Sequence, residues 1–462
     1  MQTIHIDHFK GCQVHFVGIG GISMSGLAEI LLQRGYTVTG SDLKESHITR
    51  RLIEKGARVF IGHHPANVQG AQLVVHTAAV KADNTEIQEA HKRNIPVIDR
   101  ATLLGQIMEA YPYSIAVSGS HGKTTTTSML STILLHADLD PTILVGGELD
   151  TIGGNVRTGS SPYFITEACE YVESFLHFKP YIAIILNIDA DHLDYFKDIN
   201  HIYRAFSKFA HLVPPNGYTV GCADDPLVVE LLPQLQCNTV SYGIHGPSDW
   251  KACDIHYDDR GMACFKAYYK GKFMGEVDLS IPGKHNVYNA LAATAAAHAL
   301  GIPFQVIKEA LTAYRGTHRR LELKGKMGDI IVLDDYAHHP TEIKATLETV
   351  QHYPHNRIWC VFQPHTYTRT KKLFNEFVHA FEQADRLIIT DIYAAREKDT
   401  GEVHSRDLVQ AILQTGQPCM YMQTFEEIAK YLKDNISPGD IVITVGAGDI
   451  YRVGDMLLNS AC

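Results

Sequence analysis

The stretch Ile115–Leu130, "IAVSGSHGKTTTTSML", decides how the fold of this chain is interpreted. An apolar run leads into two glycines and a lysine, and four consecutive threonines follow. Glycine and β-branched threonine both weaken a helix, so local stability does not explain this junction. Glycines let the backbone curl until several N–H groups converge on one anion, and a helix that begins there adds unpaired donors. A strand, the pattern G-x-x-G-K-T and a helix therefore predict a phosphate-binding loop.

The same loop predicts which groups hold the nucleotide. Lys123 would reach the outer phosphates and the Thr124 hydroxyl would coordinate Mg²⁺, so we expect ATP and Mg²⁺ as cofactors. The usual pattern has one more glycine, where this chain has Val117. An ordinary glycine turn with a surface lysine is the alternative interpretation. As the lysine of a phosphate loop, Lys123 is expected to face solvent and to be unneeded for packing. The residues predicted to bind the nucleotide are Gly119, Ser120, His121, Gly122, Lys123, Thr124 and Thr125.

The length of 462 residues exceeds a single core and suggests about three domains at ~150 residues each. Strand and helix patterns alternate along the whole chain, which predicts an α/β fold with parallel sheets. Breaks at "EAYPYS" and "TAYRGTHRRLELKG" divide the chain into residues 1–110, 111–320 and 321–462.

Composition narrows the class of protein. The net charge of −10 disfavours binding to nucleic acid or to anionic lipid. The sequence shows no signal-peptide pattern and no apolar stretch of ~18 residues, so we expect no membrane partner. The 9 cysteines form no C-x-x-C pair, which suits a reducing cytoplasm. We expect a cytoplasmic globular protein.

A second glycine turn, "GIGGISMSG", follows the first predicted strand. It supplies Gly18, Gly20 and Gly21, but a dinucleotide fingerprint would need glycine where Ser23 stands. Asp42 closes the next strand, where an acid commonly binds ribose hydroxyls. From these residues a cofactor such as NAD, a nucleotide-bearing substrate and tight helix–strand packing all remain open.

Acids and a histidine follow two apolar strands in the middle of the chain. Glu167 ends the strand in "YFITEA", and Asp189, Asp191 and His192 follow "YIAIIL". The carboxyl ends of parallel strands are where ligand groups are placed, so Glu167 and His192 are candidates for holding Mg²⁺. The histidine is the weaker candidate because Mg²⁺ prefers oxygen. Each could also be a helix cap or a hydrogen-bonded core residue.

Several motifs in a fixed order carry a family resemblance. They are "GSHGKTTTT", "EACEY", "NIDADHLDYF", "GKHNVYNALAA", "GTHRRLE", "DDYAHHPTE", "FQPHTYTRT" and "TVGAGDIY". On these motifs the chain resembles the Mur ligases of bacterial cell-wall synthesis, over nearly its whole length. "DDYAHHPTE" and "GAGDIY" are rather specific to the branch that adds alanine and to its close relatives, whereas the phosphate loop is not.

The resemblance implies three domains with separate tasks. A Rossmann-like N-terminal domain would bind the UDP part of the substrate, a central P-loop-type ATPase domain would bind ATP, and a Rossmann-like C-terminal domain would bind the amino acid. The implied reaction joins L-alanine to the lactyl carboxylate of UDP-N-acetylmuramate through an acyl phosphate, with release of ADP and phosphate. A monomer or homodimer is expected.

The resemblance also implies roles for single residues. Those matched to catalytic positions are Lys123, Glu167, His192, His338 and Arg369. Those matched to metal ligands are Thr124, Glu167 and His192. Those matched to further ATP contacts are Asn286, Arg319 (or its neighbour Arg320) and Asp335. Those expected at the sugar-nucleotide and alanine sites are Gly18, Gly20, Gly21, Asp42, His63, Thr77, Ala78 and Tyr336.

The chain departs from the family at two places. Thr366 stands where some relatives have arginine, so the alanine carboxylate would depend on Arg369 alone. Several Mur ligases carry a modified lysine where this chain has Phe206 or Ser207, and we do not give that role to the nearby Lys208.

Plainer interpretations of these motifs remain. "HNVYN" could cap the helix that follows it. The twin arginines could be solvated charge, and "AHHP" could be a turn before a helix that begins at Pro340.

Three other functions also compete with the alanine-adding one. They are a recycling ligase that attaches a whole peptide to the same sugar nucleotide, an NAD-dependent oxidoreductase that leaves the phosphate loop idle, and a nonenzymatic nucleotide sensor.

Overall fold

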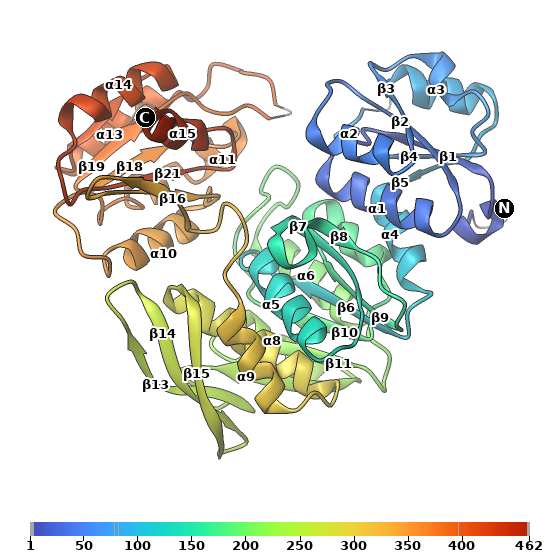
Figure 1. Cartoon of the computed structure of the whole chain (residues 1–462), viewed down its shortest axis with the longest axis horizontal. Helices are drawn as coiled ribbons and strands as arrows, with labels where there is room; N and C mark the ends of the chain where they lie inside the picture. Colours follow the sequence, from blue (N-terminus) through green and yellow to red (C-terminus); the bar gives the residue numbers. More distant parts are fainter. Residues whose placement is uncertain (1–3, 78, 82, 396, 460–462) are drawn as a thin grey trace.

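Three β-sheets, each built from one continuous part of the chain, organise the molecule (Figure 1). The computed structural model describes residues 4–77, 79–81, 83–395 and 397–459. Within these residues the sheets have five, ten and six strands, and most of the strand pairs are parallel. The prediction of a three-part α/β protein with mostly parallel sheets is confirmed.

The first sheet has the order β3-β2-β1-β4-β5 and is wholly parallel, which is the strand order of a Rossmann-like half. Its strands are β1 Gln13–Val17, β2 Thr37–Asp42, β3 Arg58–Ile61, β4 Leu73–His76 and β5 Val97–Asp99. Its helices are α1 Ile22–Gln33, α2 His47–Glu54, α3 Thr85–Lys92 and α4 Arg100–Met108, with short 3₁₀ turns η1 Ile6–Phe9 and η2 Pro65–Val68.

The second sheet is the largest and has the order β15-β14-β13-β12-β11-β10-β6-β9-β7-β8. Its strands are β6 Tyr113–Ser118, β7 Thr142–Leu149, β8 Gly154–Arg157, β9 Tyr163–Glu167, β10 Ile182–Ile185, β11 Tyr218–Cys222, β12 Asn238–Gly243, β13 Trp250–Tyr257, β14 Met262–Tyr269 and β15 Lys272–Pro282. Its helices are α5 Lys123–His136, α6 Ile199–Ala210, α7 Pro226–Leu231, α8 Lys284–Ala299 and α9 Phe304–Ala313, with η3 Asp150–Ile152, η4 Tyr171–His177 and η5 Leu232–Gln234.

The third sheet has the order β16-β17-β21-β18-β19-β20, so the last strand of the chain lies between β17 and β18. Its strands are β16 Glu322–Met327, β17 Ile330–Asp335, β18 Ile358–Phe362, β19 Arg386–Ile389, β20 Cys419–Tyr421 and β21 Ile441–Val445. Its helices are α10 Pro340–Val350, α11 Tyr367–Lys372, α12 Phe374–Val378, α13 Ser405–Gln414, α14 Phe425–Asn435 and α15 Tyr451–Asn459.

The predicted domain boundaries lie in the connections between these sheets. The boundary after residue 110 falls between α4 and β6, and the boundary after residue 320 falls between α9 and β16. As limits of independent folding units, both stay predictions.

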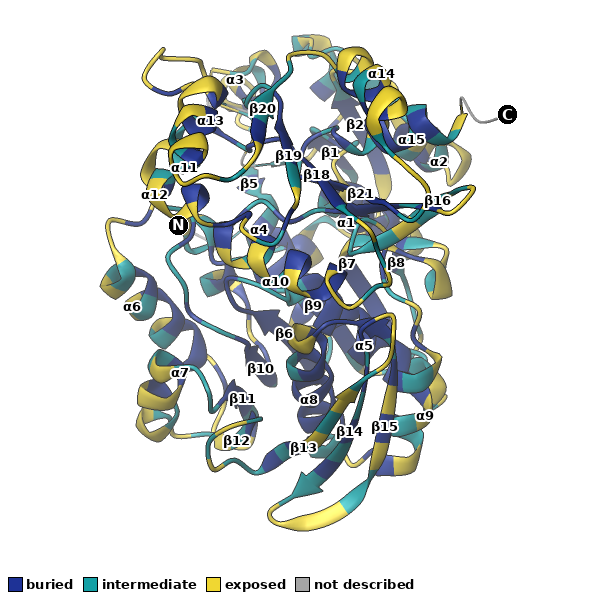
Figure 2. Ribbon diagram, turned by 90° about the vertical axis from the view of Figure 1, so that its left-hand side faces the viewer, coloured by how far each residue is buried: buried dark blue, intermediate teal, exposed yellow. Residues whose placement is uncertain are grey.

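Strand β6 is a buried inner strand of the second sheet. Ile115, Ala116 and Val117 are fully buried, and β6 is paired with β10 on one side and with β9 on the other. A parallel strand covered on both faces has no solvent side, so its residues form a continuous apolar run instead of an alternating one. Figure 2 shows β6, β10 and β21 as buried strands, whereas exposed residues gather on the outer helices. The phosphate loop therefore starts from a rigid strand.

Helix α5, which follows that loop, is buried on almost all sides because it packs against α8, α9 and the second sheet. Its threonines keep their hydroxyl groups satisfied inside this environment. Thr127 Oγ1 donates to the Lys123 carbonyl at 2.8 Å, and Thr126 Oγ1 donates to Asn289 Oδ1 at 3.2 Å. The run of threonines thus supplies small side chains that carry their own hydrogen bonds.

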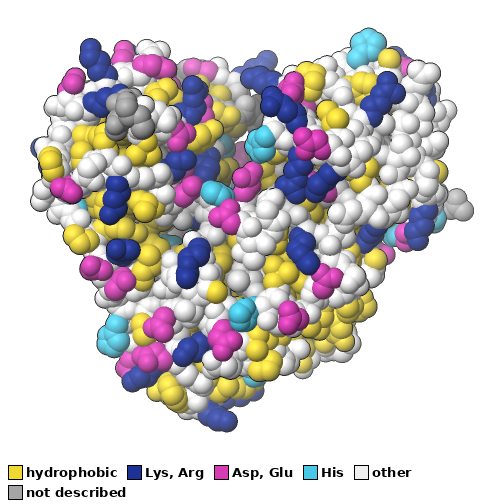
Figure 3. Space-filling view, viewed as in Figure 1, with side chains coloured by type: hydrophobic (Ala, Val, Ile, Leu, Met, Phe, Trp, Pro, Cys, Tyr) yellow, Lys and Arg dark blue, Asp and Glu magenta, His cyan; other side chains and the backbone are white. Residues whose placement is uncertain are grey.

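The visible surface carries acidic and basic side chains intermixed (Figure 3). Among the residues that the structure describes, no helix is both long and apolar enough to cross a membrane.

Helix α4 approaches the second sheet closely enough to require glycine. A Cβ atom at Gly105 would lie 2.1 Å from the carbonyl oxygen of His177 in η4, and backbone cannot yield as a flexible side chain can. This contact ties the first part of the chain to the second.

Replacement of Gly105 by alanine is expected to destabilise the protein by roughly 1–3 kcal/mol, because the methyl group forces α4 away from η4. Thermal unfolding of the full chain measures the effect. Gly454→Ala is the matched control, since its Cβ would meet only a methyl group of Val332, at 3.2 Å. Equal melting temperatures for the two variants would contradict the close approach.

Candidate active site

The loop between β6 and α5 curls through left-handed backbone at Gly119 (φ +138°) and Gly122 (φ +86°). Side chains rarely adopt these angles, and a Cβ at Gly119 would also lie 2.8 Å from Leu186 Cβ. Gly122 is the N-cap of α5 and has no side chain with which to cap it. The helix therefore presents open N–H groups to the space above the loop, as anion binding requires.

Lys123 corrects one prediction, because it does not face solvent. Its side chain is only 15 % exposed, and Nζ forms an ion pair with Glu170 at 3.0 Å. Nζ also donates to the carbonyls of Gly119 and Ser120 at 2.5 and 3.2 Å. Burial lowers the pKa of Lys123, but the charge of Glu170 outweighs that effect and the pKa is raised.

Glu170 is a site residue that the motif analysis missed. It is the second acid of "EACEY", is 1 % exposed, and lies between Lys123 and His192. Its Oε1 is 3.7 Å from His192 Nε2. Two acids three residues apart were a usable signal, but the sequence did not say which of them meets the lysine.

His192 occupies the left-handed region at φ +51° and lies among negative charges. Burial lowers its pKa, whereas a hydrogen bond with Cys169 and the charges of Asp191 and Glu170 raise it, and the net shift is upward. The raised pKa disfavours the neutral form that a metal-ligating imidazole needs.

Thr124 and Glu167 lie beside the same pair of glycines at the end of β7. Gly146 N–H donates to Glu167 Oε1 at 2.7 Å, and a Cβ at Gly147 would lie 3.2 Å from Thr124 Cγ2. Both side chains offer oxygen, the ligand type that Mg²⁺ prefers.

Among the described residues, His121, Asp189 and His339 form the one acid–histidine cluster tight enough for a metal, with ligand atoms within 4.8 Å of one another.

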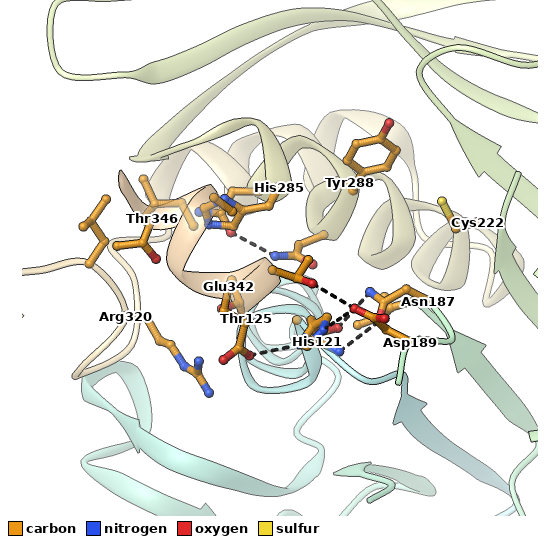
Figure 4. A pocket seen from close by; sticks show the side chains of 18 of the residues that line it. His121, Thr125, Asn187, Asp189, Cys222, His285, Tyr288, Arg320, Glu342 and Thr346 are labelled. Carbon is orange, nitrogen blue, oxygen red and sulfur yellow. Dashed lines mark hydrogen bonds and ion pairs between the residues drawn. The ribbon is translucent and has the colours of Figure 1, made fainter. Parts of the chain in front are cut away.

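A cavity of 510 Å³ opens beside the phosphate loop, between the second and third sheets (Figure 4). Five predicted nucleotide residues line it: His121, Gly122, Thr125, Asn286 and Asp335. Arg320, the alternative to Arg319, also lines it, as do residues that the sequence did not predict, among them Tyr288, Asn289 and Glu342. A cavity with a few convergent polar groups is typical of a site for a small molecule or cofactor.

The neighbouring residues Arg319 and Arg320 have different surroundings. Arg320 lines the cavity, whereas Arg319 is not among its lining residues. Arg319 bonds Asp334 at 3.1 Å and the carbonyls of Gly446 and Gly448 at 2.7 and 3.0 Å. Of the two, only Arg320 is therefore placed to reach a nucleotide in this conformation.

The interpretation of "HNVYN" as a helix cap is wrong. The N-cap of α8 is Gly283, and Asn286 lies inside the helix with its amide bonded to the Pro282 carbonyl at 2.7 Å. By contrast, "AHHP" does precede a helix: α10 begins at Pro340, and the His339 side chain caps it by accepting from Thr341 N–H.

Asp335 is a buried carboxylate at the edge of the cavity. Its oxygens accept the N–H groups of Leu321 and Ala337, each at 2.7 Å. Burial raises the pKa of Asp335 to about 6, although the positive charge of Arg320 offsets part of this rise.

A second cavity of 270 Å³ lies where the loop after β10 meets the third sheet. Four predicted residues line it: His192, Tyr336, His338 and Arg369. Arg369 Nη2 is paired with Asp191 Oδ1 at 2.9 Å, so the guanidinium crosses from α11 to the second sheet. Burial lowers the pKa of His338 to about 4, which leaves a neutral ring there.

Thr366, one of the departures from the family pattern, also lines the second cavity. Its φ of +68° is unusual for a β-branched residue, and Thr366 as a whole is 9 % exposed at the N-cap of α11. The backbone strain shows that packing holds this segment in place against a local preference.

The glycine turn that follows β1 is not part of either cavity, because none of its described residues is among the lining residues of the two. Gly20 N–H donates to Asp42 Oδ2 at 2.9 Å, and a Cβ at Gly18 would lie 2.7 Å from Thr77 Cγ2. Gly21 is the N-cap of α1. The prediction for Ala78 falls outside the described residues.

His63 joins a buried network beside that turn. Its Nδ1 lies 2.9 Å from Ser41 Oγ and 3.5 Å from Glu86 Oε2. Burial raises the pKa of Glu86, but hydrogen bonds from His15, Ser41 and Asn67 lower it to about 2. Glu86 is fully buried and was not foreseen from the sequence.

The comparisons with known proteins cover nearly the whole chain. Three family models match in order: "Mur ligase family, catalytic domain" over residues 13–112, "Mur ligase middle domain" over residues 117–297, and "Mur ligase, glutamate ligase domain" over residues 319–448.

Curated relatives and solved structures agree with these matches. The UDP-N-acetylmuramate–L-alanine ligase of Caldanaerobacter subterraneus subsp. tengcongensis is 56 % identical over 457 residues, which is 99 % of each chain. That of Acetivibrio thermocellus is 57 % identical over 458 residues, 99 % of this chain and 98 % of the relative. The crystal structure of UDP-N-acetylmuramate-alanine ligase from Thermotoga maritima has a TM-score of 0.83 at 30 % identity, covering 97 % of this chain and 99 % of that one.

Removal of the Lys123 side chain is expected to lower stability, because Glu170 would be left buried without its counter-charge. Breaking a buried pair typically costs about 3–5 kcal/mol, whereas an exposed pair is worth up to about 1 kcal/mol. Melting temperatures of Lys123→Ala and of the control Lys208→Ala test this, since Lys208 pairs with Glu173 at the same 3.0 Å but is 60 % exposed. A smaller loss for Lys123→Ala than for the control would refute it.

The raised pKa of Asp335 predicts a pH dependence of stability. Because the folded state holds this proton more tightly than the unfolded chain, the stabilisation is complete below about pH 4 and is lost as pH rises through about 6. Asp335→Asn cannot titrate at this position. Its free energy of unfolding, relative to that of wild type, should therefore rise by on the order of 1–3 kcal/mol between pH 5 and pH 7, which melting temperatures at the two pH values would show. A difference that stays constant with pH would contradict the shift.

Proposed function

The chain belongs to the Mur ligase family, and from that premise we propose that it joins L-alanine to the lactyl carboxylate of UDP-N-acetylmuramate. The reaction consumes ATP and releases ADP and phosphate. The observation that carries the proposal is the 56–57 % identity, over almost the full length, to relatives that bear the name of this ligase. We further expect the protein to work in the cytoplasm as a monomer or homodimer.

The chemistry explains why ATP is needed. A carboxylate cannot be amidated directly, because an oxide or hydroxide ion is a poor leaving group. The lactyl carboxylate attacks the γ-phosphate of ATP, which gives an acyl phosphate and ADP. The amine of L-alanine then attacks the activated carbonyl carbon and expels phosphate. No covalent enzyme intermediate is required, so the protein acts by positioning and by offsetting charge.

The first cavity supports the role of the nucleotide site. Lys123 lies where the outer phosphates would replace the Glu170 carboxylate as its partner, and the open N–H groups of α5 face the same space. Asn286 and Arg320 line the same cavity. We assign the phosphate contact of the twin arginines to Arg320.

The side-chain oxygens of Thr124 on α5 and of Glu167 at the end of β9 are donors that fit Mg²⁺. Thr124 and Glu167 would hold the ion, which supplies positive charge that offsets the charge on the transferring phosphoryl group. His192 fits it less well, because Mg²⁺ prefers oxygen ligands and His192 Nε2 lies 3.7 Å from Glu170 Oε1. We therefore propose Thr124 and Glu167 as the metal ligands, and His192 as a charge partner of Glu170.

The second cavity supports a small amino acid as the other substrate. Its 270 Å³ is below the roughly 300–1,000 Å³ of pockets that take drug-sized ligands, so a single residue fits better than a peptide. Arg369 would bind the alanine carboxylate in place of Asp191. The neutral ring of His338 would accept the proton that the amine of alanine releases as it attacks. The UDP part is proposed to bind at Gly18, Gly20, Gly21, Asp42 and Thr77, with His63 nearby.

The other functions are less well supported. The structure of a murein peptide ligase from Psychrobacter arcticus matches with a TM-score of 0.75 at 26 % identity, below the values of the alanine ligase structure. The NAD-dependent alternative leaves the first cavity without a role, and Ser23 stands where its fingerprint needs glycine.

The proposal is tested by following ADP release from the purified full chain with ATP, Mg²⁺ and UDP-N-acetylmuramate. L-alanine should give rapid release, glycine and L-serine slower release, and a free tripeptide none above background. Release with the tripeptide alone would favour the recycling ligase. ATP binding without release under any of these conditions would favour a nucleotide sensor.

A further inference from the structure

The His121 side chain lies on the phosphate loop but bonds two acids from different parts of the chain. Its Nε2 is 3.1 Å from Asp189 Oδ2, in the loop after β10, and its Nδ1 is 3.2 Å from Glu342 Oε1, on α10 of the third sheet. The side chain is 14 % exposed. Figure 4 shows His121 between these two acids, with dashed lines to both. The phosphate loop is thereby tied to the part of the chain that carries the second cavity.

Glu342 continues the connection toward that cavity. While Oε1 faces His121, Oε2 accepts the backbone N–H of His338 at 3.1 Å. His338 lines the second cavity, and its own Nδ1 is 3.5 Å from Oε2. One carboxylate thus holds the phosphate loop with one oxygen and the start of the "HHP" segment with the other.

The charges around His121 favour its cationic form. Burial lowers the pKa of His121, but its bonds to Asp189 and Glu342, with the further charge of Asp191, raise it to about 10. The ring of His339 packs beside it, with centroids 4.8 Å apart. Hydrogen bonds from a cation to carboxylates are about twice as strong as neutral ones, so the link resists opening at neutral pH.

The backbone N–H and carbonyl groups of His121 both form hydrogen bonds with the Asn187 side chain. Its N–H donates to Asn187 Oδ1 at 2.9 Å, and its carbonyl accepts from Asn187 Nδ2 at 3.1 Å. The residue is therefore held in one orientation, and neither its N–H group nor its ring is free to bind a phosphate as the structure stands. The proposed reaction leaves the side chain without a chemical task.

We propose that His121 is a positioning residue, which couples the nucleotide cavity to the amino-acid cavity through Glu342 and His338. The inference rests on the proposed function and adds to it a mechanical link between its two substrates. Nucleotide that orders the phosphate loop orders His121, which in turn keeps α10 and His338 in place for the incoming alanine. Two further contacts, from Thr341 Oγ1 to Asp189 Oδ2 at 3.0 Å and from His339 Nε2 to the Ala190 carbonyl at 3.3 Å, support the same contact surface.

The test compares His121→Asn, Glu342→Gln and the double variant with wild type. Each single variant should lower kcat by about tenfold or more and raise the KM for alanine, while the Kd for a non-hydrolysable ATP analogue with Mg²⁺ stays within about threefold. If the two residues act as one link, the kcat of the double variant should lie within about twofold of the kcat of the more impaired single variant.

His136→Asn serves as the matched control, because His136 also faces a glutamate, Glu309 at 3.5 Å, but lies 42 % exposed at the far end of α5. Its kcat and KM should stay near those of wild type. Effects of His121→Asn and Glu342→Gln that multiply in the double variant, an equal loss of nucleotide affinity and kcat, or an unchanged KM for alanine would each overturn the proposal.

A second measurement separates this inference from the proposed function. Small-angle scattering of the full chain with the Mg²⁺-bound ATP analogue should give a larger radius of gyration for His121→Asn than for wild type, because α10 is released from the loop. If wild type forms no ADP with alanine, the proposed function fails, and this comparison still tests the link. Equal radii at saturating analogue would overturn it.

Discussion

The left-handed turn at Gly119 and Gly122 is the constraint on which the rest of the site depends. It lies at the carboxyl end of β6, the buried strand between β9 and β10. Because these strands are parallel and in register, Val117 pairs with Glu167 at the same edge of the sheet. The loop, the acid that ends β9 and the acids after β10 therefore meet above one edge, where α5 presents its open N–H groups.

Around this turn, each buried cation is matched by an acid from another segment. Lys123 meets Glu170, His121 meets Asp189 and Glu342, and Arg369 meets Asp191. Charges placed this way are partly desolvated before any ligand arrives, so an incoming phosphate or carboxylate replaces an existing partner instead of a full hydration shell. Two of these pairs, His121 with Glu342 and Arg369 with Asp191, also join the second part of the chain to the third, so the ionic network connects the parts as well as forming a binding surface.

The motifs predicted the kind of site better than its geometry. Gly122, Thr125, Asn286 and Asp335 line the first cavity, and four more predicted residues line the second. Local pattern could not decide between Glu167 and Glu170, or between Arg319 and Arg320, because neighbours on a chain point in different directions once the backbone is folded. For the same reason it placed Lys123 in solvent, where the structure has it paired with an acid 47 residues away.

The sequence by itself determined the order of strands and helices, the phosphate loop and the division into three α/β parts, because glycine conformation, apolar runs and helix signals act over a few residues. It also carried the motifs from which the family is identified. Only the tertiary structure decided which acid faces each cation and how the third sheet closes on the loop. Those contacts join residues as far apart as His121 and Glu342, and they depend on burial and on the register of the sheet, which no short stretch of sequence contains.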